Sequence, residues 1–223
     1  MKQKIFFITG TDTGVGKTTM TVLLANFLRK RCINTAALKP ICSGGRGDAQ
    51  KFFTATDGAL SLAEINPWHF SAPVAPLLAA RLEKKKVKLL QLLAHIRSKQ
   101  KHFEILLVEG AGGLLSPLGE GFDSRDLILA LRATPIIVTQ NKIGAVNQIL
   151  LTLEALPEKF QAKARVVLMS PQKTDATAKT NAKLLAQFFA AKRIFTLPWL
   201  GENFSAPEAL KNPRLRRLLR ALA

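Results

Sequence analysis

The sequence has 223 residues and contains no tyrosine, two cysteines, three histidines and no long hydrophobic run. Cys32 and Cys42 have no spacing typical of a metal site, and so few cysteines suit a reducing compartment. The apolar runs are short and interrupted, which excludes a segment able to span a bilayer. The N-terminus enters a predicted strand directly, without the pattern of a secretory leader. We therefore expect a cytoplasmic protein.

Acidic residues are also scarce. The chain has 15 Asp and Glu and 33 Lys and Arg, which gives a formal net charge of +18. The excess is spread along the chain, with the densest clusters at Lys84–Lys86 with Lys88 and at Arg214, Arg216, Arg217 and Arg220. No aromatic residues alternate with these basic runs, which weakens a stacking platform for nucleic acid. We expect a solvated basic surface, with neither nucleic acid nor membrane as a partner.

A phosphate-binding loop is present at residues 10–19, Gly-Thr-Asp-Thr-Gly-Val-Gly-Lys-Thr-Thr, between an apolar run and a helical pattern. Backbone N–H groups of such a loop face an anion, with Lys17 against the outer phosphates and the Thr18 hydroxyl on Mg²⁺. The strict pattern has glycine where this chain has Thr11, so the match is a variant. The loop predicts a nucleotide-binding protein.

Short apolar runs alternate with helical patterns along the rest of the chain. This alternation predicts one P-loop NTPase-like α/β domain over residues 1–223, a doubly wound, mostly parallel sheet with helices on both faces. The predicted strands are Lys4–Thr9, Thr35–Lys39, Glu104–Glu109, Pro135–Thr139, Arg165–Met169 and Ile194–Leu197. The predicted helices are Lys17–Arg31, Val74–Leu82, Leu89–Lys99, Ser124–Ala133, Ala145–Leu156, Ala176–Ala190 and Pro207–Leu219, and residues 41–73 have weak periodicity.

Ligands collect at the carboxyl ends of the strands in such a fold, so the residues that follow the strands are candidates for the site. Glu109 stands where P-loop proteins place a Mg²⁺-coordinating carboxylate, and Asp48 is a weaker second candidate. Lys39 ends an apolar strand and is either a solvated strand end or a cation aimed at a developing anion. Ser43, followed by two glycines, could form a second anion nest. The histidines lie away from the strand ends, which indicates no Ser-His-Asp or Cys-His site.

Taken together, these segments resemble the dethiobiotin synthetase family. The matching segments are Thr9–Thr13 with Val15–Thr18, Lys39-Pro40 with Ser43-Gly44, Val108–Gly113, Gly144 with Asn147, and Pro198–Leu200 with Glu202-Asn203. A middle segment, Asn66-Pro67 with Phe70 and Ala72-Pro73, is similar as well. The resemblance covers nearly the whole chain, and its specificity lies in the ordered set of segments.

The resemblance implies a homodimer that converts 7,8-diaminononanoate, CO₂ and MgATP into dethiobiotin, ADP and phosphate. Lys39 then becomes the principal catalytic candidate, with Lys17 and Thr11 beside it. Mg²⁺ would be held by Thr18, Asp48 and Glu109, and the substrate by Thr11, Ser43 and the helix start at Gly144, Ala145 and Asn147, supplied by the partner subunit. ATP, as co-substrate, would contact Thr13, Gly14, Val15, Gly16, Lys17, Thr18, Thr19, Asp48, Glu109, Gly110, Ala111, Gly112, Pro198, Trp199 and Leu200.

Three positions depart from the family pattern. Met169-Ser170 stands where the family commonly has Asn-Asp at the adenine, which bears on nucleotide choice. Asn181 replaces a tyrosine near the substrate carboxylate, and Ser205 replaces a frequent glutamate.

Two other P-loop classes remain as alternatives. A cobyrinic-acid-type synthetase would need a glutamine-hydrolysing domain with a nucleophilic cysteine, for which 223 residues leave no room. A partitioning switch that dimerises on membrane or DNA would suit the positive charge. That group has a signature lysine five residues before the P-loop lysine, and this chain has Asp12 there.

Overall fold

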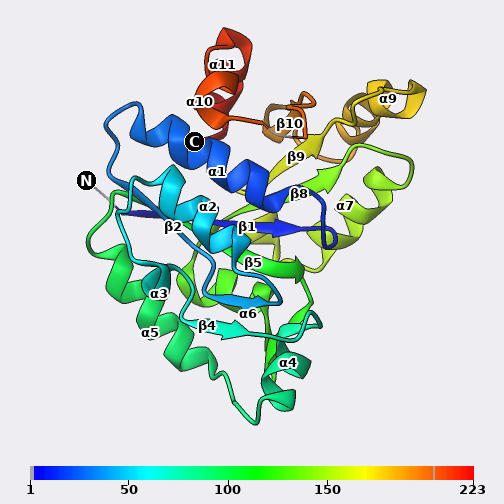
Figure 1. Cartoon of the computed structure of the whole chain (residues 1–223). Coiled ribbons are helices and arrows are strands. Elements are labelled where there is room, and N and C mark those ends of the chain that lie inside the picture. The colour runs from blue at the N-terminus through cyan, green and yellow to red at the C-terminus, as the bar shows by residue number, and fades with distance from the viewer. Residues whose placement is uncertain (1–2, 203) are drawn as a thin grey trace.

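A six-stranded parallel sheet with the order β10-β9-β8-β1-β5-β2 forms the centre of the computed structural model, which describes residues 3–202 and 204–223 (Figure 1). Its strands are β1 (Lys4–Gly10), β2 (Thr35–Leu38), β5 (Ile105–Gly113), β8 (Thr134–Gln140), β9 (Arg165–Met169) and β10 (Ile194–Leu197). Every neighbouring pair in this sheet is parallel. The predicted α/β class and all six predicted strands are therefore confirmed, with small shifts at the strand ends.

Helices connect the strands and cover the sheet (Figure 1). They are α1 (Lys17–Arg29), α2 (Gly47–Ala55), α3 (Leu62–Ile65), α4 (Pro76–Leu82), α5 (Leu89–Gln100), α6 (Ser124–Leu131), α7 (Ala145–Glu154), α8 (Glu158–Gln161), α9 (Ala176–Leu185), the 3₁₀ turn η1 (Ala191–Arg193), α10 (Ala206–Ala209) and α11 (Pro213–Leu222). Two small sheets flank the central one: the parallel pair β3 (Ile41–Ser43) and β4 (Trp68–Phe70), and the antiparallel pair β6 (Pro117–Gly119) and β7 (Phe122–Asp123). No helix among the described residues is long and apolar enough to cross a membrane.

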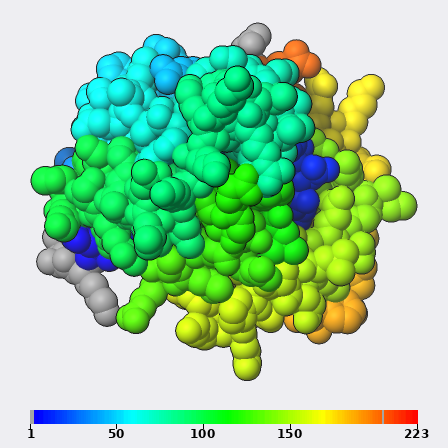
Figure 2. Space-filling model, turned by 90° about the horizontal axis from the view of Figure 1, so that it is seen from below, coloured from blue at the N-terminus to red at the C-terminus, as the bar shows by residue number. Residues whose placement is uncertain are grey.

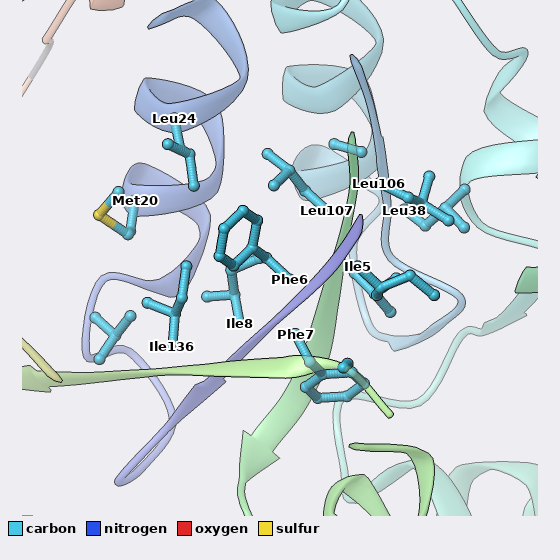
Figure 3. Close-up of a cluster of buried hydrophobic side chains, with 14 of the residues drawn as sticks. Ile5, Phe6, Phe7, Ile8, Met20, Leu24, Leu38, Leu106, Leu107 and Ile136 are labelled. Atoms are coloured by element: carbon cyan, nitrogen blue, oxygen red, sulfur yellow. The ribbon is translucent and has the colours of Figure 1, made fainter. Parts of the chain in front are cut away.

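Strand β1 is buried on both faces, which explains its continuous apolar sequence. Phe6 and Ile8 point to the side of α1, where Met20 and Leu24 lie, and Phe7 points to the opposite side (Figure 3). Successive strand side chains alternate between faces, so one strand contributes to two hydrophobic layers. The face seen from below is formed mainly by the middle of the chain, coloured cyan to yellow (Figure 2).

The C-terminal helical prediction is wrong in one respect, because residues 207–219 do not form one helix. The chain breaks after α10 and restarts at Pro213, which has no N–H to continue the preceding helix. The Asn212 side chain accepts hydrogen bonds from the N–H groups of Arg214 and Leu215 and so caps the start of α11. Helix α9 also ends earlier than predicted, at Leu185. The weakly periodic residues 41–73 contain β3, α2, α3 and β4.

Candidate active site

The P-loop connects the end of β1 to the start of α1 at Lys17. Gly14 and Gly16 have φ angles of 73° and 100°, in the left-handed region that glycine adopts without strain. The Lys17 ammonium donates a hydrogen bond of 2.7 Å to the carbonyl oxygen of Asp12. Lys17 is only 6% exposed, so its cation is held inside the loop.

Burial is the main cause that lowers the pKa of Lys17, to about 8, and the neighbouring Lys39 lowers it further. Glu109, Asp12 and Asp48 oppose this shift without cancelling it. A phosphate chain beside this ammonium would stabilise its charged form, because an opposite charge at short range favours ionisation.

A second buried lysine forms the centre of the site. The Lys39 ammonium lies 2.6 Å from Glu109 Oε1 and 2.9 Å from Asp48 Oδ2. Glu109 is 1% exposed, and the Thr18 hydroxyl donates a hydrogen bond of 2.9 Å to the same Oε1 atom. The sequence left open whether Lys39 is a solvated strand end. The structure excludes that alternative, since the ammonium is buried between two carboxylates.

These charges set one another's ionisation. Burial acts to lower the pKa of Lys39, but Glu109 and Asp48 outweigh it and the pKa is raised well above its ordinary value. Burial acts to raise the pKa of Asp48, but Lys39 outweighs it and the pKa is lowered. Lys39 and Asp48 therefore hold each other in their charged forms near neutral pH.

The same cluster has the donor set of a magnesium site. Asp48 and Glu109 both accept hydrogen bonds from the Lys39 ammonium, and the Thr18 hydroxyl donates to Glu109, so three oxygen-bearing side chains lie together. Hydroxyl and carboxylate oxygens are the ligands that Mg²⁺ takes, usually with one or two carboxylates and the rest from phosphates and water. No group of three or more His, Cys, Asp or Glu side chains that could hold a metal occurs among the described residues. The residues present thus fit Mg²⁺ bound together with a nucleotide.

Two adjoining hollows meet at the P-loop. The first has a volume of about 720 Å³ and contains Lys17, Thr18, Lys39, Asp48 and Glu109. The second, of about 530 Å³, lies between the P-loop and the ends of β9 and β10. Gly14, Gly16 and Thr19 line both hollows, so a ligand could lie across the P-loop and reach into each.

The chain matches a family model described as an AAA domain over residues 4–204. It is 39% identical over 173 residues to an ATP-dependent dethiobiotin synthetase of Anaeromyxobacter sp. (strain Fw109-5), covering 76% of this chain and 78% of that protein. It is 35% identical over 198 residues to an ATP-dependent dethiobiotin synthetase of Akkermansia muciniphila, covering 88% and 90%. The chain belongs to the dethiobiotin synthetase family.

Solved structures of partition ATPases share the fold. A putative plasmid partition protein from Borrelia burgdorferi B31 bound to AMPPNP has a TM-score of 0.62 at 15% identity, covering 100% of this chain and 97% of that one. A ParA family ATPase from Chlorobium tepidum has a TM-score of 0.58 at 12% identity, covering 99% and 98%. At such low identity the likeness shows the fold alone, and the dethiobiotin synthetase family accounts for the sequence.

Most of the residues predicted from the family pattern lie around the two hollows. Those lining the first are Thr13, Gly14, Gly16, Lys17, Thr18, Thr19, Lys39, Ser43, Asp48, Glu109, Ala111 and Gly112. Those lining the second include Val15, Pro198, Trp199 and Leu200. Asn203, the last residue of the matching segments, lies outside the described residues.

Five predicted residues line neither hollow. The Thr11 hydroxyl is 2.8 Å from that of Thr139 on β8. Gly110 is buried, and a Cβ added at this position would lie 2.7 Å from Ser124 Oγ. The absence of a side chain at Gly110 therefore allows close packing against α6. Gly144, Ala145 and Asn147 form the start of α7, outside the hollow that contains Lys39. Within one chain, the proposed substrate-carboxylate position is thus separate from the phosphate site.

Two departures from the dethiobiotin synthetase pattern have structural explanations. Met169 lines the second hollow and packs against the P-loop, with its Cε 3.0 Å from where a Cβ on Gly16 would lie. Asn181 is 5% exposed and donates hydrogen bonds to the Asn141 side chain and the Lys142 carbonyl. It therefore braces the segment after β8.

Sequence reasoning missed Thr21. Its hydroxyl is fully buried and donates a hydrogen bond of 2.7 Å to Glu109 Oε2, the oxygen that Lys39 does not contact. Thr21 follows Thr18 by three residues, which places both hydroxyls on one face of α1. The spacing shows that the two threonines share a helix face, and only the packing of β5 against α1 places Glu109 beside Thr21.

Replacing Thr21 with valine should reduce the rate of ATP turnover by about 10–100-fold, as for other outer residues that orient a metal ligand. Valine keeps the shape and leaves Glu109 Oε2 without its donor. Thr21→Ser, which retains the hydroxyl, should stay close to wild type. Steady-state kinetics over a range of Mg²⁺ concentrations would check this, and a valine variant with unchanged magnesium dependence would contradict it.

Proposed function

We propose that this chain is an ATP-dependent dethiobiotin synthetase, a ligase that closes the ureido ring of dethiobiotin from 7,8-diaminononanoate, CO₂ and ATP in biotin biosynthesis. The main support for the proposal is that two buried lysines, Lys17 and Lys39, and the carboxylate of Glu109 line one cavity beside the P-loop. The family membership supports the same reaction.

The nucleotide would lie across the P-loop. Its phosphates would face the backbone N–H groups of Gly14 and Gly16 and the Lys17 ammonium, as the positive end of a helix and a cationic side chain suit a phosphate. Its base would enter the second hollow, between Met169 and the segment Pro198–Leu200. Thioether and aromatic surfaces in this hollow can pack on either face of a base.

The reaction needs a carbamate, a phosphoryl transfer and a ring closure. One substrate amine adds CO₂ and loses a proton, and a carbamate oxygen then takes the γ-phosphoryl group while ADP leaves. The second amine attacks the carbonyl carbon, loses a proton and expels phosphate. Phosphoryl transfer depends mainly on positioning and charge neutralisation. Lys39 supplies a fixed ammonium to the transferred group, and Ser43 lies in the same cavity to bind the carbamate.

Thr18, Asp48 and Glu109 would hold Mg²⁺, which supplies Lewis-acid neutralisation of the nucleotide phosphates when bound. With a divalent cation on these carboxylates, Lys39 is no longer needed to neutralise them. Its ammonium is then available to the carbamate and the γ-phosphoryl group.

The substrate carboxylate would be bound by a second subunit. The start of α7 presents backbone N–H groups and the exposed Asn147, which suits a carboxylate but lies outside the hollow that contains Lys39. Leu151, one helical turn after Asn147 on α7, is 63% exposed, and Ile143, just before the start of the helix, is 82% exposed. Apolar side chains on this face would be buried in a homodimer that brings the α7 of one subunit to the Lys39 cavity of the other.

Replacing Leu151 with glutamate should therefore dissociate the dimer and reduce turnover at least about tenfold, because a charge would be buried in the interface. Leu90 is 78% exposed on α5, away from this face, so Leu90→Glu is the matched control and should retain the dimer. Analytical ultracentrifugation and kinetics together give the readout. A Leu151→Glu variant that remains dimeric would place the interface elsewhere.

The proposed reaction is tested by measuring phosphate release from MgATP with bicarbonate, with and without 7,8-diaminononanoate. Release that depends on the diamine, with dethiobiotin detected by mass spectrometry, is expected. Release that ignores the diamine and increases with DNA or lipid would overturn the proposal in favour of a partition-type switch. A cytoplasmic location, which belongs to this proposal, would be checked by fractionating cells that express the full chain.

A further inference from the structure

Eleven lysines and arginines from segments far apart in the sequence gather at the amino edge of the central sheet, opposite the P-loop. Six of them line a hollow of about 620 Å³ between α1 and α11: Lys30, Arg31, Lys211, Arg216, Arg217 and Arg220. Five line a neighbouring hollow of about 400 Å³ at the starts of the strands: Lys4, Lys163, Arg165, Lys192 and Arg193. We name these eleven residues the basic edge.

The two hollows lie close to each other. Arg220 lines the first and Ala221 the second, so both reach the last turn of α11. Helix α1 starts at Lys17 in the active site and ends at Arg29, and its C-cap Lys30 belongs to the basic edge. The helix lies along the upper side of the sheet in Figure 1. The basic edge and the active site thus lie at opposite ends of α1.

The cations of the basic edge have almost no acidic partners. Among residues 3–202 and 204–223, Lys211 alone of the eleven forms an ion pair, with Glu208 at 2.8 Å. Seven of the eight ion pairs formed by the described residues lie outside the basic edge, and two of them are Arg29 with Asp57 and Arg81 with Glu120. The scarce acids therefore neutralise other regions and leave this edge positive.

Two cations of the edge are also crowded against an apolar ring. Lys4 Nζ and Arg165 Cζ lie 4.3 Å and 4.9 Å from the centre of the Phe6 ring. Burial, and secondly Arg165, lowers the pKa of Lys4. The Nη1 atom of Arg165 is buried without a hydrogen-bond partner in the described part of the chain. Lys4 Nζ donates a hydrogen bond of 2.7 Å to the Ala223 oxygen. An anion at the edge would reduce the repulsion between Lys4 and Arg165, whereas the buried Nη1 atom lies out of its reach.

We propose that the basic edge binds the phosphate backbone of duplex nucleic acid without reading its sequence. Arginine guanidinium groups donate paired hydrogen bonds to phosphate oxygens, and several cations in a row match a polyanion. The edge has no exposed aromatic ring among its lining residues, since Phe27 and Phe195 are both buried, so unpaired bases have nothing to stack on.

A bilayer surface fits less well. Leu215, Leu219 and Leu222 of α11 are all buried against the core, which leaves this helix no apolar face to insert among lipids. We expected no nucleic-acid partner because the positive charges are spread evenly along the sequence. In the folded chain, eleven of these charges from distant segments lie together at this edge.

The test is fluorescence anisotropy with a labelled random-sequence DNA duplex of about 20 base pairs, two helical turns. If six phosphates are contacted, the affinity should fall about 10³-fold between ~50 and ~200 mM salt, and binding should persist near ~150 mM. The edge variant is Lys30→Gln with Arg216→Gln, Arg217→Gln and Arg220→Gln. It should weaken binding at least about 30-fold and reduce the salt slope by roughly 3 to 4.

The matched control removes four positive charges outside the basic edge. This variant is Lys84→Gln with Lys85→Gln, Lys86→Gln and Lys88→Gln, and its affinity for the duplex should stay within about threefold of wild type. Equal losses in the two variants would overturn the proposal, because binding would then reflect net charge alone. Absence of binding near ~150 mM salt, tighter binding to single strands, or binding only to vesicles containing phosphatidylserine would overturn it too.

The basic edge is independent of the proposed ligase reaction, and two measurements separate them. The edge variant should retain its thermal transition and its diamine-dependent phosphate release, since its residues lie at the far end of α1 from the active site. Lys17→Ala, which removes the P-loop cation, should lose turnover and still bind the duplex. Loss of duplex binding in the Lys17 variant would show that the nucleic acid occupies the nucleotide site and would overturn the proposal.

Discussion

Replacing Lys39 with alanine is expected to lower kcat by about 10³-fold or more, because it removes a fixed cation aimed at the charge that develops on the transferred phosphoryl group. Its ammonium is buried between Asp48 and Glu109, at the base of the cavity that also contains Lys17. MgATP should still bind, since the P-loop is unchanged and Mg²⁺ can neutralise both carboxylates. Phosphate release and calorimetric titration with MgATP measure the two effects separately.

Lys51→Ala is the matched control. Lys51 lines the same cavity but is exposed, so its removal should change kcat less than about tenfold, as expected for a solvated charge. Turnover near the wild-type rate in Lys39→Ala would remove Lys39 from the mechanism. Loss of MgATP binding in that variant would mean that Lys39 holds the nucleotide and does not act on the reacting group alone.

Replacing Lys39 with methionine should lower the melting temperature in metal-free buffer by roughly 6–20 °C. The apolar side chain fills the same space. Among residues 3–202 and 204–223, only the hydroxyls of Thr18 and Thr21 then remain as side-chain donors to Glu109, which is 1% exposed. Removing one partner of a buried ion pair costs about 3–5 kcal/mol, and one kcal/mol corresponds to about 2–4 °C in a chain of this size. Differential scanning calorimetry gives the shift.

A second substitution identifies the cause of this instability. Lys39→Met combined with Glu109→Gln should be more stable than Lys39→Met alone, because the amide is neutral and needs no cation. Lys30→Met, at an exposed position on the other end of α1, should leave the melting temperature nearly unchanged. A double variant as unstable as the single one would attribute the loss to packing and not to the charge of Glu109.

The strands and the site at their carboxyl ends could be predicted because both depend on local sequence. Short runs such as Ile105–Val108 are apolar at every position, which is typical of a strand covered on both faces. The break between α10 and α11 was missed since Leu215 and Leu219 continue the helical spacing, while the stop comes from one missing N–H at Pro213 and one side-chain cap at Asn212. Helical periodicity does not report such single hydrogen bonds.

Within the site, the pattern identified each ionisable group but not how the groups pair. Lys39, Asp48 and Glu109 come from three different segments, and whether Lys39 meets solvent or two carboxylates depends on how those segments pack. Thr21 was missed for the same reason, since a threonine within a helix has a role only when another strand places Glu109 beside it. The separation of α7 from the Lys39 cavity also depends on the packing of distant segments.

The sequence by itself determined the parallel α/β architecture, the P-loop, the family and the identity of the charged residues at the strand ends, because periodicity and short motifs are local properties of the chain. Only the tertiary structure decided that Lys39 neutralises the two carboxylates that would hold Mg²⁺. It also decided that basic residues as distant as Lys4 and Arg220 border neighbouring hollows. Charges interact through space, so a count along the chain gives their sum, and the fold gives the field that they produce.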